Sequence, residues 1–520
     1  MATASRGKGR GAANGTAKSG ARSLGAKAGR APAEPRRGLT WFALTAAVVG
    51  GVLALRLGVN ALGLNPVHFD EAQYWAYGQE LDWGYFSKPP LVAAAIRATT
   101  DAFGDTLFGL RLSAPLAHAL VAWMIFLTGA RLWDGRTGFW AAAGYTLAPG
   151  VAFSSMLATT DPLLMAAWAV ALYTMVRGLG GGGAGWWIAC GAAIGLGLLA
   201  KYTMAAMPLA ALVFLAFAPE AERRDWRGVA IACGVGLLVF APNIAWNAAH
   251  GFATIAHVAE DADPGQGYLN PGELAAFAGA QLAVIGPPFF LALFPALLAR
   301  SDWRRDWGMR LLLWQCWLLL GAMIALSLVT RANGNWAAPA YVAGALVAAR
   351  WLLRSGWRGW LTAQIAIGAS VAVVLWSAAA LYAARPGALP AVADPFRKAR
   401  LGPAFCALAL DAMEAEGADV LLSQSRHRLS ECMFAGDLGW DAIAVWNPDL
   451  EPANHHELVS TLRAGDERRM ILAVTGDAAA IAGRFDRQRR IDGGEIATHR
   501  DRAIPYRLWV VQGFRGYDGG

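Results

Sequence analysis

Long apolar runs separated by short polar turns occupy most of the chain. Several of them hold roughly 18–25 residues, and a helix needs about 20 to cross a bilayer. The pattern predicts a polytopic α-helical membrane protein with about eleven transmembrane helices, within a range of about 10–13. These spans fill most of residues 39–384, at Thr40–Leu57, Leu107–Leu132 and residues 137–154, 162–176, 185–200, 202–218, 228–247, 273–299, 310–329, 335–350 and 359–384.

The two ends of the chain lack such runs and differ from each other. Residues 1–38 consist mostly of Ala, Gly, Lys and Arg with the single acid Glu34. We expect a disordered basic tail there, because this composition cannot bury a core. Residues 385–520 alternate short apolar runs with helix-like stretches, which predicts a small α/β domain. Its expected strands are residues 419–423, 442–446, 470–475 and 507–512, and its expected helices are residues 403–416, 455–463 and 477–485.

Basic residues predict the orientation of the spans. The basic tail precedes the first span, and Lys and Arg beside a span stay in the cytoplasm. Arginines recur in the turns that this rule places on the cytoplasmic side: Arg131, Arg136, Arg177, Arg223, Arg224, Arg300, Arg304, Arg305, Arg350, Arg354 and Arg358. We therefore expect a multi-pass membrane protein with a cytoplasmic N-terminus. An odd number of spans then places residues 59–106 and 385–520 on the outer side of that membrane.

Composition narrows the class of protein further. Hydrophobic residues make up 56% of the chain and charged residues 16%, against about 25% charged in an average protein. The net charge of +8 lies largely in the N-terminal tail and does not indicate nucleic-acid binding. Cys190, Cys233 and Cys316 fall in apolar runs, as buried small side chains do. The sequence leaves open whether Cys406 and Cys432 pair, because pairing needs an oxidising compartment.

The stretch from His68 to Pro90, HFDEAQYWAYGQELDWGYFSKPP, carries more chemistry than the other turns. Residues 70–81 suit a short helix in the membrane interface, where aromatic side chains are common. Tyr74, Trp75 and Tyr85 are the candidates for interface or acceptor contacts. Pro89 and Pro90 end that helix, and residues 91–103 predict a second short amphipathic helix.

Several charged residues on the predicted outer side oppose the topological bias. The cations are Lys88, Arg97, Arg111, Lys201 and Arg331, and the acids are Asp70, Glu71, Asp161, Glu260, Asp261 and Asp263. An anionic ligand at the membrane surface would account for the cations. Carboxylates for acid/base work, facing cations that stabilise a phosphate, predict chemistry with a phosphate leaving group. Asp70, Glu71 and Asp161 are the candidate catalytic residues.

Simpler interpretations stay open at this stage. A charged turn between spans is often only solvated, and Asp161 could act as the N-cap of the helix that begins at Pro162. His68, His250 and His257 could bind a divalent metal together with the acids, with His68 and Asp161 as the candidate ligands. No metal motif such as HExxH supports this, and no certain cofactor is indicated.

An ordered series of motifs resembles a known family. The motifs are HFDEAQYW, LDWGYFSKPPL, FGLRL at 108–112, LATTDP at 157–162, LLAKYT at 198–203, APNIAWNAAHGF at 241–252 and RANGNWAAPAY at 331–341. They resemble the membrane glycosyltransferases of the GT-C type. The bacterial branch in question is related to dolichyl-phosphate-mannose protein mannosyltransferases and to the aminoarabinose transferases that modify lipid A. The resemblance covers residues 40–350, and it extends loosely to LLSQSRHRLSECMFAG and PANHHEL in the C-terminal region.

The resemblance implies an inverting sugar transfer from a polyprenyl phosphate carrier at the periplasmic face of the inner membrane. The family's general base corresponds to Asp70, its donor-phosphate lysine to Lys88 and its second outer acid to Asp161. Residues facing the lipid phosphate correspond to Arg331, Asn333 and Asn335, and we add Lys201 as a phosphate-binding candidate. The aminoarabinose transferases have a metal-binding glutamate before the lysine, where this chain has Ser87.

The expected partners are a polyprenyl-phosphate sugar, a lipid or glycan acceptor and the bilayer, with no nucleic acid. Lipid A, core or another envelope glycan is the first expectation for the acceptor, and protein O-glycosylation is the alternative. A transporter is a remote alternative, because transporters place polar groups near the bilayer midplane in repeated halves, and no repeat is visible here. A receptor that binds its ligand in the C-terminal domain would leave the dense chemistry of residues 68–90 unexplained.

Overall fold

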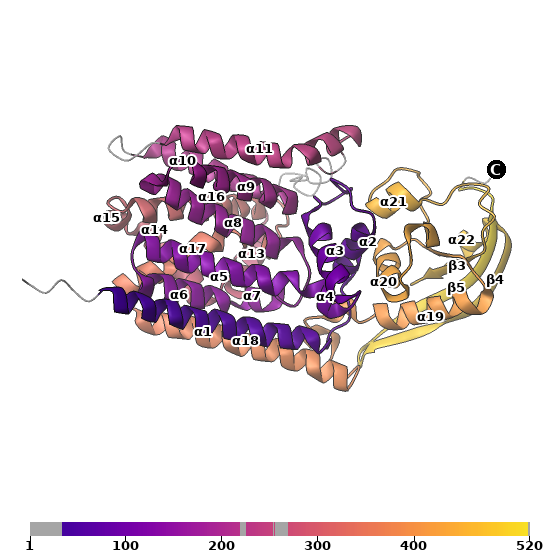
Figure 1. The fold of residues 1–520 in the computed structure, drawn as a ribbon. Coiled ribbons are helices and arrows are strands. Elements are labelled where there is room, and N and C mark those ends of the chain that lie inside the picture. The colour runs from indigo at the N-terminus through magenta and orange to yellow at the C-terminus, as the bar shows by residue number, and fades with distance from the viewer. Residues whose placement is uncertain (1–33, 219–224, 253, 255–268, 518–520) are drawn as a thin grey trace, which may run out of the picture.

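A computed structural model of the chain describes residues 34–218, 225–252, 254 and 269–517. Most of the predicted basic tail lies outside the described residues, although its last part already belongs to the first helix, α1 (Glu34–Ala61). The helices form one elongated body, and a small sheet lies beyond one end of it (Figure 1). The prediction of a helical membrane body followed by a small C-terminal α/β domain is confirmed.

The helical body has a helix at each predicted span. After α1 come α5 (Ser113–Leu132), α6 (Gly135–Thr146), α7 (Pro149–Ser154), α8 (Thr160–Arg177), α9 (Ala184–Ala200), α10 (Ala206–Phe217), α11 (Trp226–Ala249), α13 (Pro271–Val284), α14 (Pro287–Leu298), α15 (Arg300–Trp303), α16 (Trp307–Ser327), α17 (Ala340–Arg354) and α18 (Arg358–Ala384). Short 3₁₀ turns at Tyr202–Ala205 (η2) and Gly334–Ala337 (η3) precede α10 and α17.

Among the described residues, six helices are long and apolar enough to cross a membrane. They are Gly38–Ala61, Leu107–Leu132, Thr160–Gly182, Trp226–Ala249, Trp307–Ser327 and Arg358–Ala384. The pair α13 and α14, bent by 112°, would make a seventh, and two shorter apolar helices occupy Ala184–Ala200 and Tyr202–Phe217. The membrane body is therefore present, and the number of about eleven crossings stays a prediction.

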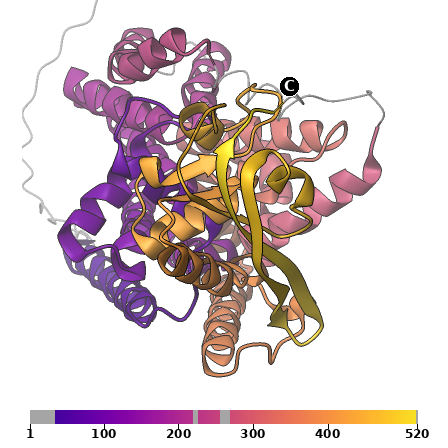
Figure 2. The ribbon, with the colours of Figure 1, turned by 90° about the vertical axis from the view of Figure 1, so that its right-hand side faces the viewer.

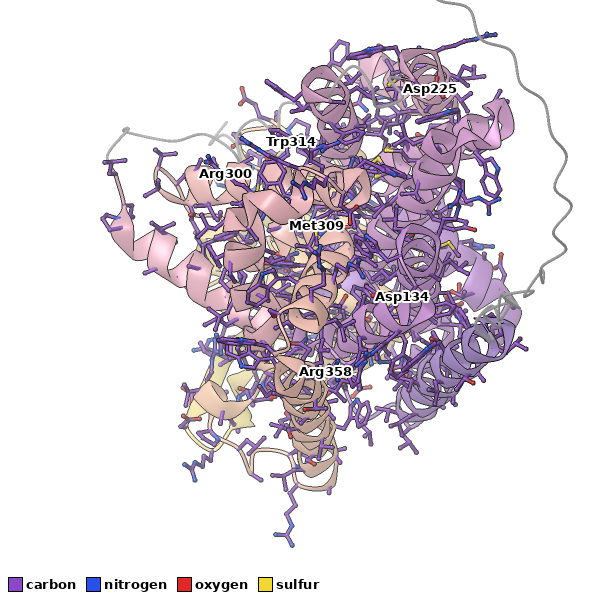
Figure 3. The ribbon with its side chains drawn as sticks, turned by 90° about the vertical axis from the view of Figure 1, so that its left-hand side faces the viewer. Asp134, Asp225, Arg300, Met309, Trp314 and Arg358 are labelled. Atoms are coloured by element: carbon purple, nitrogen blue, oxygen red, sulfur yellow. A yellow bond between two sulfur atoms is a disulfide. The ribbon has the colours of Figure 1, made fainter. Side chains whose placement is uncertain are left out.

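Close helix contacts hold the body together. A Cβ built on Gly129 of α5 would lie 2.7 Å from Cα of Gly138 in α6, so only glycine allows this approach. Small residues at such contacts let helix backbones pack where lipid supplies no hydrophobic driving force. Figure 3 views the end of the body away from the sheet, where the N-cap residues Asp134 and Asp225 lie with Arg300 and Arg358.

The first loop (residues 62–106) connects α1 to the rest of the body on the side of the sheet. It forms α2 (Phe69–Gln79) and α3 (Leu91–Phe103), close to the two predicted short helices, and α4 (Leu107–Arg111) follows it. The C-cap of α3 is Gly104, whose φ of 79° is a conformation that glycine adopts readily.

The sheet domain (Gly402–Phe514) has five strands in the order β2-β1-β3-β5-β4. The first three are parallel, and β4 and β5 form a long antiparallel hairpin on one edge (Figure 2). The strands are β1 (Val420–Ser423), β2 (Ile443–Val445), β3 (Met470–Val474), β4 (Phe485–His499) and β5 (Arg502–Phe514). The helices are α19 (Gly402–Glu416), α20 (Arg426–Gly436), α21 (His455–Ser460) and α22 (Ala479–Ala482), with 3₁₀ turns η4 (Ala391–Ala393) and η5 (Arg397–Ala399) before them.

Two elements of this domain were not predicted. β4 is largely exposed along its central part, so it lacks the apolar run by which the other strands are recognised. α20 occupies residues for which no helix was predicted, and the helix expected over 477–485 is reduced to α22. β4 and α20 are polar segments, and their structure depends on contacts with neighbouring segments.

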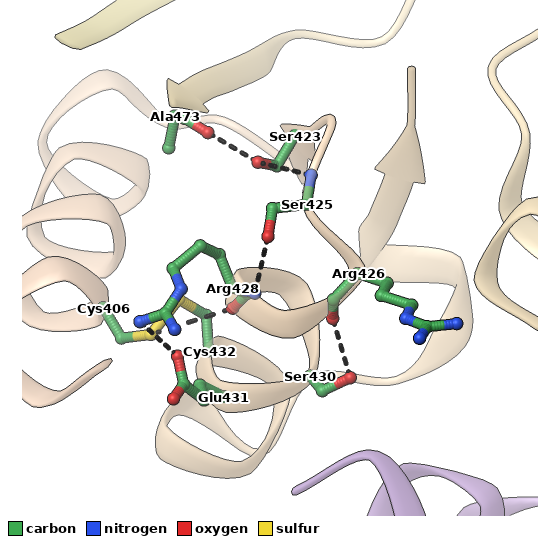
Figure 4. The surroundings of a disulfide bond; sticks show 9 residues. All are labelled: Cys406, Ser423, Ser425, Arg426, Arg428, Ser430, Glu431, Cys432 and Ala473. Atoms are coloured by element: carbon green, nitrogen blue, oxygen red, sulfur yellow. Dashed lines mark hydrogen bonds and ion pairs between the residues drawn. A yellow bond between two sulfur atoms is a disulfide. The ribbon is translucent and has the colours of Figure 1, made fainter. Parts of the chain in front are cut away.

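A disulfide joins α19 to α20, which answers the question that the sequence left open. Cys406 and Cys432 are bonded, with their Cα atoms 4.9 Å apart (Figure 4). The helix that this bond ties to the domain is also the one that packs most extensively on α2 of the first loop. The disulfide therefore fixes the part of the domain that contacts the loop.

Four aromatic side chains of the first loop, Tyr74, Trp75, Tyr77 and Tyr85, are buried in one cluster with residues of the sheet domain. Trp75 packs edge-on against Phe434 of α20, with ring centroids 5.3 Å apart. Tyr77 stacks on Tyr85, and the Trp440 indole donates a hydrogen bond to the Ala76 carbonyl. Tyr74, Trp75 and Tyr85 are each at least 95% buried in this junction, so the membrane-interface part of the expectation is wrong, whereas acceptor contact stays a prediction.

Candidate active site

Asp70 lies in the first turn of α2, with a partly exposed carboxylate. The side chain of His68 caps this helix by accepting a hydrogen bond from the Asp70 backbone N–H at 3.3 Å. His68 Nδ1 is also 3.6 Å from Oδ2 of Asp70, whose side chain is 43% exposed. A negative charge is favoured at a helix N-terminus. Burial lowers the pKa of His68, which keeps its ring neutral beside this carboxylate.

Glu71, the next residue, has the opposite environment. Its carboxylate is fully buried and accepts two hydrogen bonds from Arg111, Nε to Oε1 at 2.8 Å and Nη2 to Oε2 at 2.7 Å. It also accepts from the backbone N–H groups of His68 and Ala158. A carboxylate with four donors has little capacity left for a substrate. Its geometry suits a positioning residue that connects the start of α2 to the turn before α8.

Asp161 accepts hydrogen bonds from two other predicted site residues. Lys201 Nζ lies 2.8 Å from its Oδ1, and the Asn335 amide donates to its Oδ2 at 2.6 Å. Lys88 is close enough to act on Asp161 electrostatically. The N-cap of α8 is Thr159, so the N-cap interpretation of Asp161 is wrong. The structure thus unites residues from three distant turns in one charged cluster.

Lys88 is placed by a loop that is anchored on α11. Tyr85 and Lys88 exchange backbone hydrogen bonds in a tight turn. Three residues of the loop contact α11: the Trp83 carbonyl accepts from Asn243 at 2.6 Å, Asp82 accepts from the Trp246 indole, and Gly84 lies against the Trp246 ring. Asn243 and Trp246 come from the APNIAWN motif, so this motif holds the first loop in position.

The remaining predicted cations and amides take different positions. Arg331 and Asn333 are exposed in the turn before η3. Arg97 forms an ion pair with Asp101 on the surface of α3, so no anionic ligand is needed to explain this cation on the outer side. Glu260, Asp261, Asp263 and His257 lie outside the described residues.

A cavity of ≈ 340 Å³ opens beside the charged cluster. Asp161, Asn335 and Tyr341 line it, together with His118 and Tyr145 from the helical body. His118 makes hydrogen-bond contacts with the hydroxyls of Tyr145 and Ser154, at 2.8 and 3.1 Å. These residues were not predicted as site residues. His118 could have been recognised from the sequence, because it lies inside the predicted span Leu107–Leu132 and an ionisable residue within a span is a functional candidate.

An apolar groove of ≈ 600 Å³ adjoins this cavity. Gly150, Phe153 and Val284 line both. The other walls of the groove come from α7, α13, α14 and α18, and consist almost entirely of apolar side chains. A cavity with charged and polar groups in its wall that continues into an apolar groove fits a ligand with a polar head and a hydrocarbon tail.

The sheet domain reaches the start of α2. His427 of α20 packs on Phe69, with ring centroids 4.0 Å apart. The charge of Lys398 acts on His68, and that of Arg426 acts on Tyr74 and Tyr77 of α2. The motifs to which site roles were assigned lie in residues 68–341, so the sequence analysis assigned no role to Lys398, Arg426 or His427.

The described residues contain no group of three His, Cys, Asp or Glu side chains arranged to hold a metal ion. His68 caps α2, Asp161 is occupied by Lys201 and Asn335, and His250 stacks on Trp246. Ser87 stands before Lys88. The donor set in this part of the chain therefore does not fit the metal site considered from the sequence.

Comparison with known proteins gives consistent matches. Residues 87–246 match the family described as dolichyl-phosphate-mannose-protein mannosyltransferase. The lipid A galacturonosyltransferase RgtD of Rhizobium johnstonii is 31% identical over 367 residues, which cover 70% of this chain and 76% of that protein. An undecaprenyl phosphate-α-4-amino-4-deoxy-L-arabinose arabinosyl transferase of Pseudomonas fluorescens is 31% identical over 174 residues, 32% of this chain and 30% of that protein.

Among solved structures, ArnT from Cupriavidus metallidurans bound to undecaprenyl phosphate has a TM-score of 0.60. The match covers 90% of this chain and 98% of that one at 17% identity, which shows a shared fold. The apo form of the same protein gives a TM-score of 0.59 over 91% and 98% of the two chains, at 16% identity.

Proposed function

Since this chain belongs to the GT-C type membrane glycosyltransferases, we propose that it transfers a sugar from a polyprenyl phosphate to lipid A or the lipopolysaccharide core. One observation carries the proposal: Asp161 and Asn335 of the Asp161–Lys201–Asn335 cluster line a cavity that adjoins an apolar groove. A polyprenyl-phosphate sugar has the matching chemistry. Its hydrocarbon tail fits the groove, its phosphate fits the cations and its sugar fits the cavity. The similarity to a lipid A galacturonosyltransferase supports lipid A as the acceptor.

Asp70 is the proposed general base. An acceptor hydroxyl is a weak nucleophile until its proton is removed as the new bond forms. Of the two adjacent acids at the start of α2, Asp70 has the accessible carboxylate, whereas that of Glu71 is fully occupied. The hydroxyl oxygen attacks the anomeric carbon while Asp70 takes its proton. The bond from that carbon to the phosphate oxygen breaks with its electron pair on the phosphate, which inverts the anomeric configuration.

Lys88 and Lys201 are proposed to stabilise the leaving phosphate. Fixed cations aimed at developing negative charge are the usual means of accelerating such a step. Asp161 keeps Lys201 in place and orients the Asn335 amide. Arg331 and Asn333, exposed in the same turn as Asn335, are proposed to contact the lipid phosphate from its open side.

The reaction is proposed to occur at the periplasmic face of the inner membrane, with the N-terminus in the cytoplasm and the sheet domain in the periplasm. Two observations support this orientation. The Cys406–Cys432 disulfide suits an oxidising compartment. Arg300 and Arg358 lie at the opposite end of the helical body, as expected of a cytoplasmic face (Figure 3).

The test is sugar transfer by purified protein in detergent, with a polyprenyl-phosphate sugar and lipid A. We expect Asp70→Asn to lower turnover by about 10²–10⁴-fold and to unfold at the wild-type temperature. Asp101→Asn is the matched control, because Asp101 lies on the exposed face of α3. Wild-type turnover by the Asp70→Asn variant would show that Asp70 is not the general base. A wild-type protein that transfers no sugar would overturn the proposed function.

A further inference from the structure

A basic pocket lies between the sheet domain and the start of α2. Its volume is ≈ 200 Å³, and Phe69, the residue before Asp70, forms part of its wall. Arg397, Lys398, Arg428 and Arg502 line it, and none of its lining residues is acidic. It shares no lining residue with the cavity lined by Asp161 or with the apolar groove.

Three of these cations face solvent. Arg397, Lys398 and Arg502 are exposed, and none of them has a carboxylate within ion-pair distance among the described residues. Arg428 differs, because it is buried and paired with Glu431 at 2.5 Å. Burial, followed by the neighbouring positive charges, lowers the pKa of His427 to about 4. The pocket therefore presents three solvent-facing cations and a neutral imidazole.

The segment that carries these cations is held rigidly. Asp394 and Arg400 flank η5 and form a fully buried ion pair, with Nε 2.7 Å from Oδ2. His499, beside the β4–β5 turn, contacts the same carboxylate at 3.2 Å. Burying such a pair is costly unless its geometry is well satisfied. These contacts fix η5 and the hairpin turn relative to each other, so Arg397, Lys398 and Arg502 are displayed in a defined arrangement.

The pocket also lies beside the end of α18, a helix long and apolar enough to cross a membrane. Tyr382, in the last turn of α18, donates a hydrogen bond to the carbonyl of Thr498, a pocket residue. The guanidinium of Arg400 stacks over the Tyr382 ring at 3.5 Å. A lipid headgroup beside the end of α18 would therefore meet these cations.

We propose that this basic pocket binds a phosphate group on the headgroup of the lipid acceptor and thereby presents the acceptor hydroxyl to Asp70. The lipid identity of the acceptor rests on the proposed function. Phosphate matches several converging Arg and Lys donors in charge and geometry. The pocket and the donor cavity have separate walls, so a donor and an anionic acceptor can be held at the same time.

The test measures binding first, without donor, using the full-length protein in nanodiscs of neutral lipid. The probes are lipid A carrying its phosphates and lipid A from which the phosphates have been removed. The double variant Lys398→Gln/Arg502→Gln removes two cations of the pocket. Arg487→Gln/Arg490→Gln is the matched control, because both arginines are exposed on β4 and neither lines the pocket.

We expect the pocket variant to bind phosphorylated lipid A more than about tenfold more weakly, and the control to bind it as the wild type does. Dephosphorylated lipid A should bind equally to all three proteins. In the transfer assay, the pocket variant should raise KM for phosphorylated lipid A by a similar factor with kcat unchanged. Equal binding of phosphorylated lipid A by the pocket variant and the wild type overturns the inference.

Two further arms separate the sources of phosphate. If phosphatidylglycerol or inorganic phosphate displaces lipid A at equal phosphate concentration, the pocket is a general anion or bilayer contact, and the acceptor assignment is overturned. The two proposals can fail separately. Binding through these cations without sugar transfer overturns the proposed function alone, whereas transfer with unchanged binding in the pocket variant overturns the pocket alone.

Discussion

The carboxylate of Glu71 and the guanidinium of Arg111 form a two-bond ion pair that solvent barely reaches, with side chains 0% and 3% exposed. Forty positions separate the two residues in the chain. The same carboxylate accepts the Ala158 N–H, three residues before Asp161. Glu71 therefore connects the segment that carries the proposed base to the segment that carries the second acid.

Replacing Glu71 with Gln should destabilise the protein. Arg111 would keep its charge in a buried site without a counterion, and breaking a buried pair in this way costs about 3–5 kcal/mol. We expect a clear drop in the unfolding temperature in detergent. Glu80→Gln, at the exposed C-cap of α2, is the control and should unfold as the wild type does. Wild-type stability of Glu71→Gln would show that the pair does not hold the loop in place.

The contact between Gly84 and Trp246 should be sensitive to a single methyl group. A Cβ at Gly84 would lie 2.4 Å from the Trp246 ring, so the loop must move away from α11. Lys88 lies four residues further on, and we expect Gly84→Ala to lower sugar transfer by about tenfold or more, since small displacements of a site residue have large effects on rate. Gly58→Ala is the control, because nothing lies within 4 Å of that position. Normal transfer by Gly84→Ala would contradict this role of α11.

Acid should destabilise the sheet domain through His456. Burial, followed by the positive charges of neighbouring residues, lowers the pKa of His456 to about 3, against about 6.5 in an unfolded chain. The unfolded state therefore binds a proton at higher pH than the folded state does. The neutral ring contributes stability that is fully present above about pH 6.5 and is lost as the pH falls towards 3.

His456→Gln lacks this titrating group, so its free energy of unfolding should not show the loss that the wild type shows as the pH falls. The difference in free energy of unfolding between the wild type and His456→Gln should therefore become smaller in acid. Between pH 7.5 and 4.5 we expect this difference to narrow by about 2–3 kcal/mol. Thermal unfolding of both proteins across this range measures it. A difference that does not change with pH would show that His456 does not titrate between the two states.

The proposed orientation can be tested with introduced cysteines. Leu450 is 62% exposed in the sheet domain, and we expect Leu450→Cys to react with a membrane-impermeant thiol reagent in intact spheroplasts. Ser355→Cys, in the exposed turn between α17 and α18, should react only after lysis. If Ser355→Cys reacts in intact spheroplasts and Leu450→Cys reacts only after lysis, the sheet domain lies in the cytoplasm and the proposed orientation is wrong.

Asp70 and Glu71 illustrate the limit of prediction from local sequence. They are adjacent, acidic and part of one motif, and the sequence grouped them as candidate catalytic residues. The two acids differ because Arg111 pairs with Glu71, and Arg111 lies beside Glu71 only after the chain has folded. Asp161 shows the converse, since its position in a turn between spans was predicted, whereas its partners Lys201 and Asn335 come from turns far along the chain.

The sequence by itself determined the helical membrane body, the two short helices of the first loop and most strands of the sheet domain, because each depends on a local period of apolar residues. Only the tertiary structure decided which charges pair, that the loop aromatics pack on the sheet domain, and that β4 pairs with β5 despite its polar sequence. Such features depend on contacts between distant segments. The basic pocket beside Asp70 is of this kind, because Phe69, Lys398 and Arg502 come from three segments that only folding brings together.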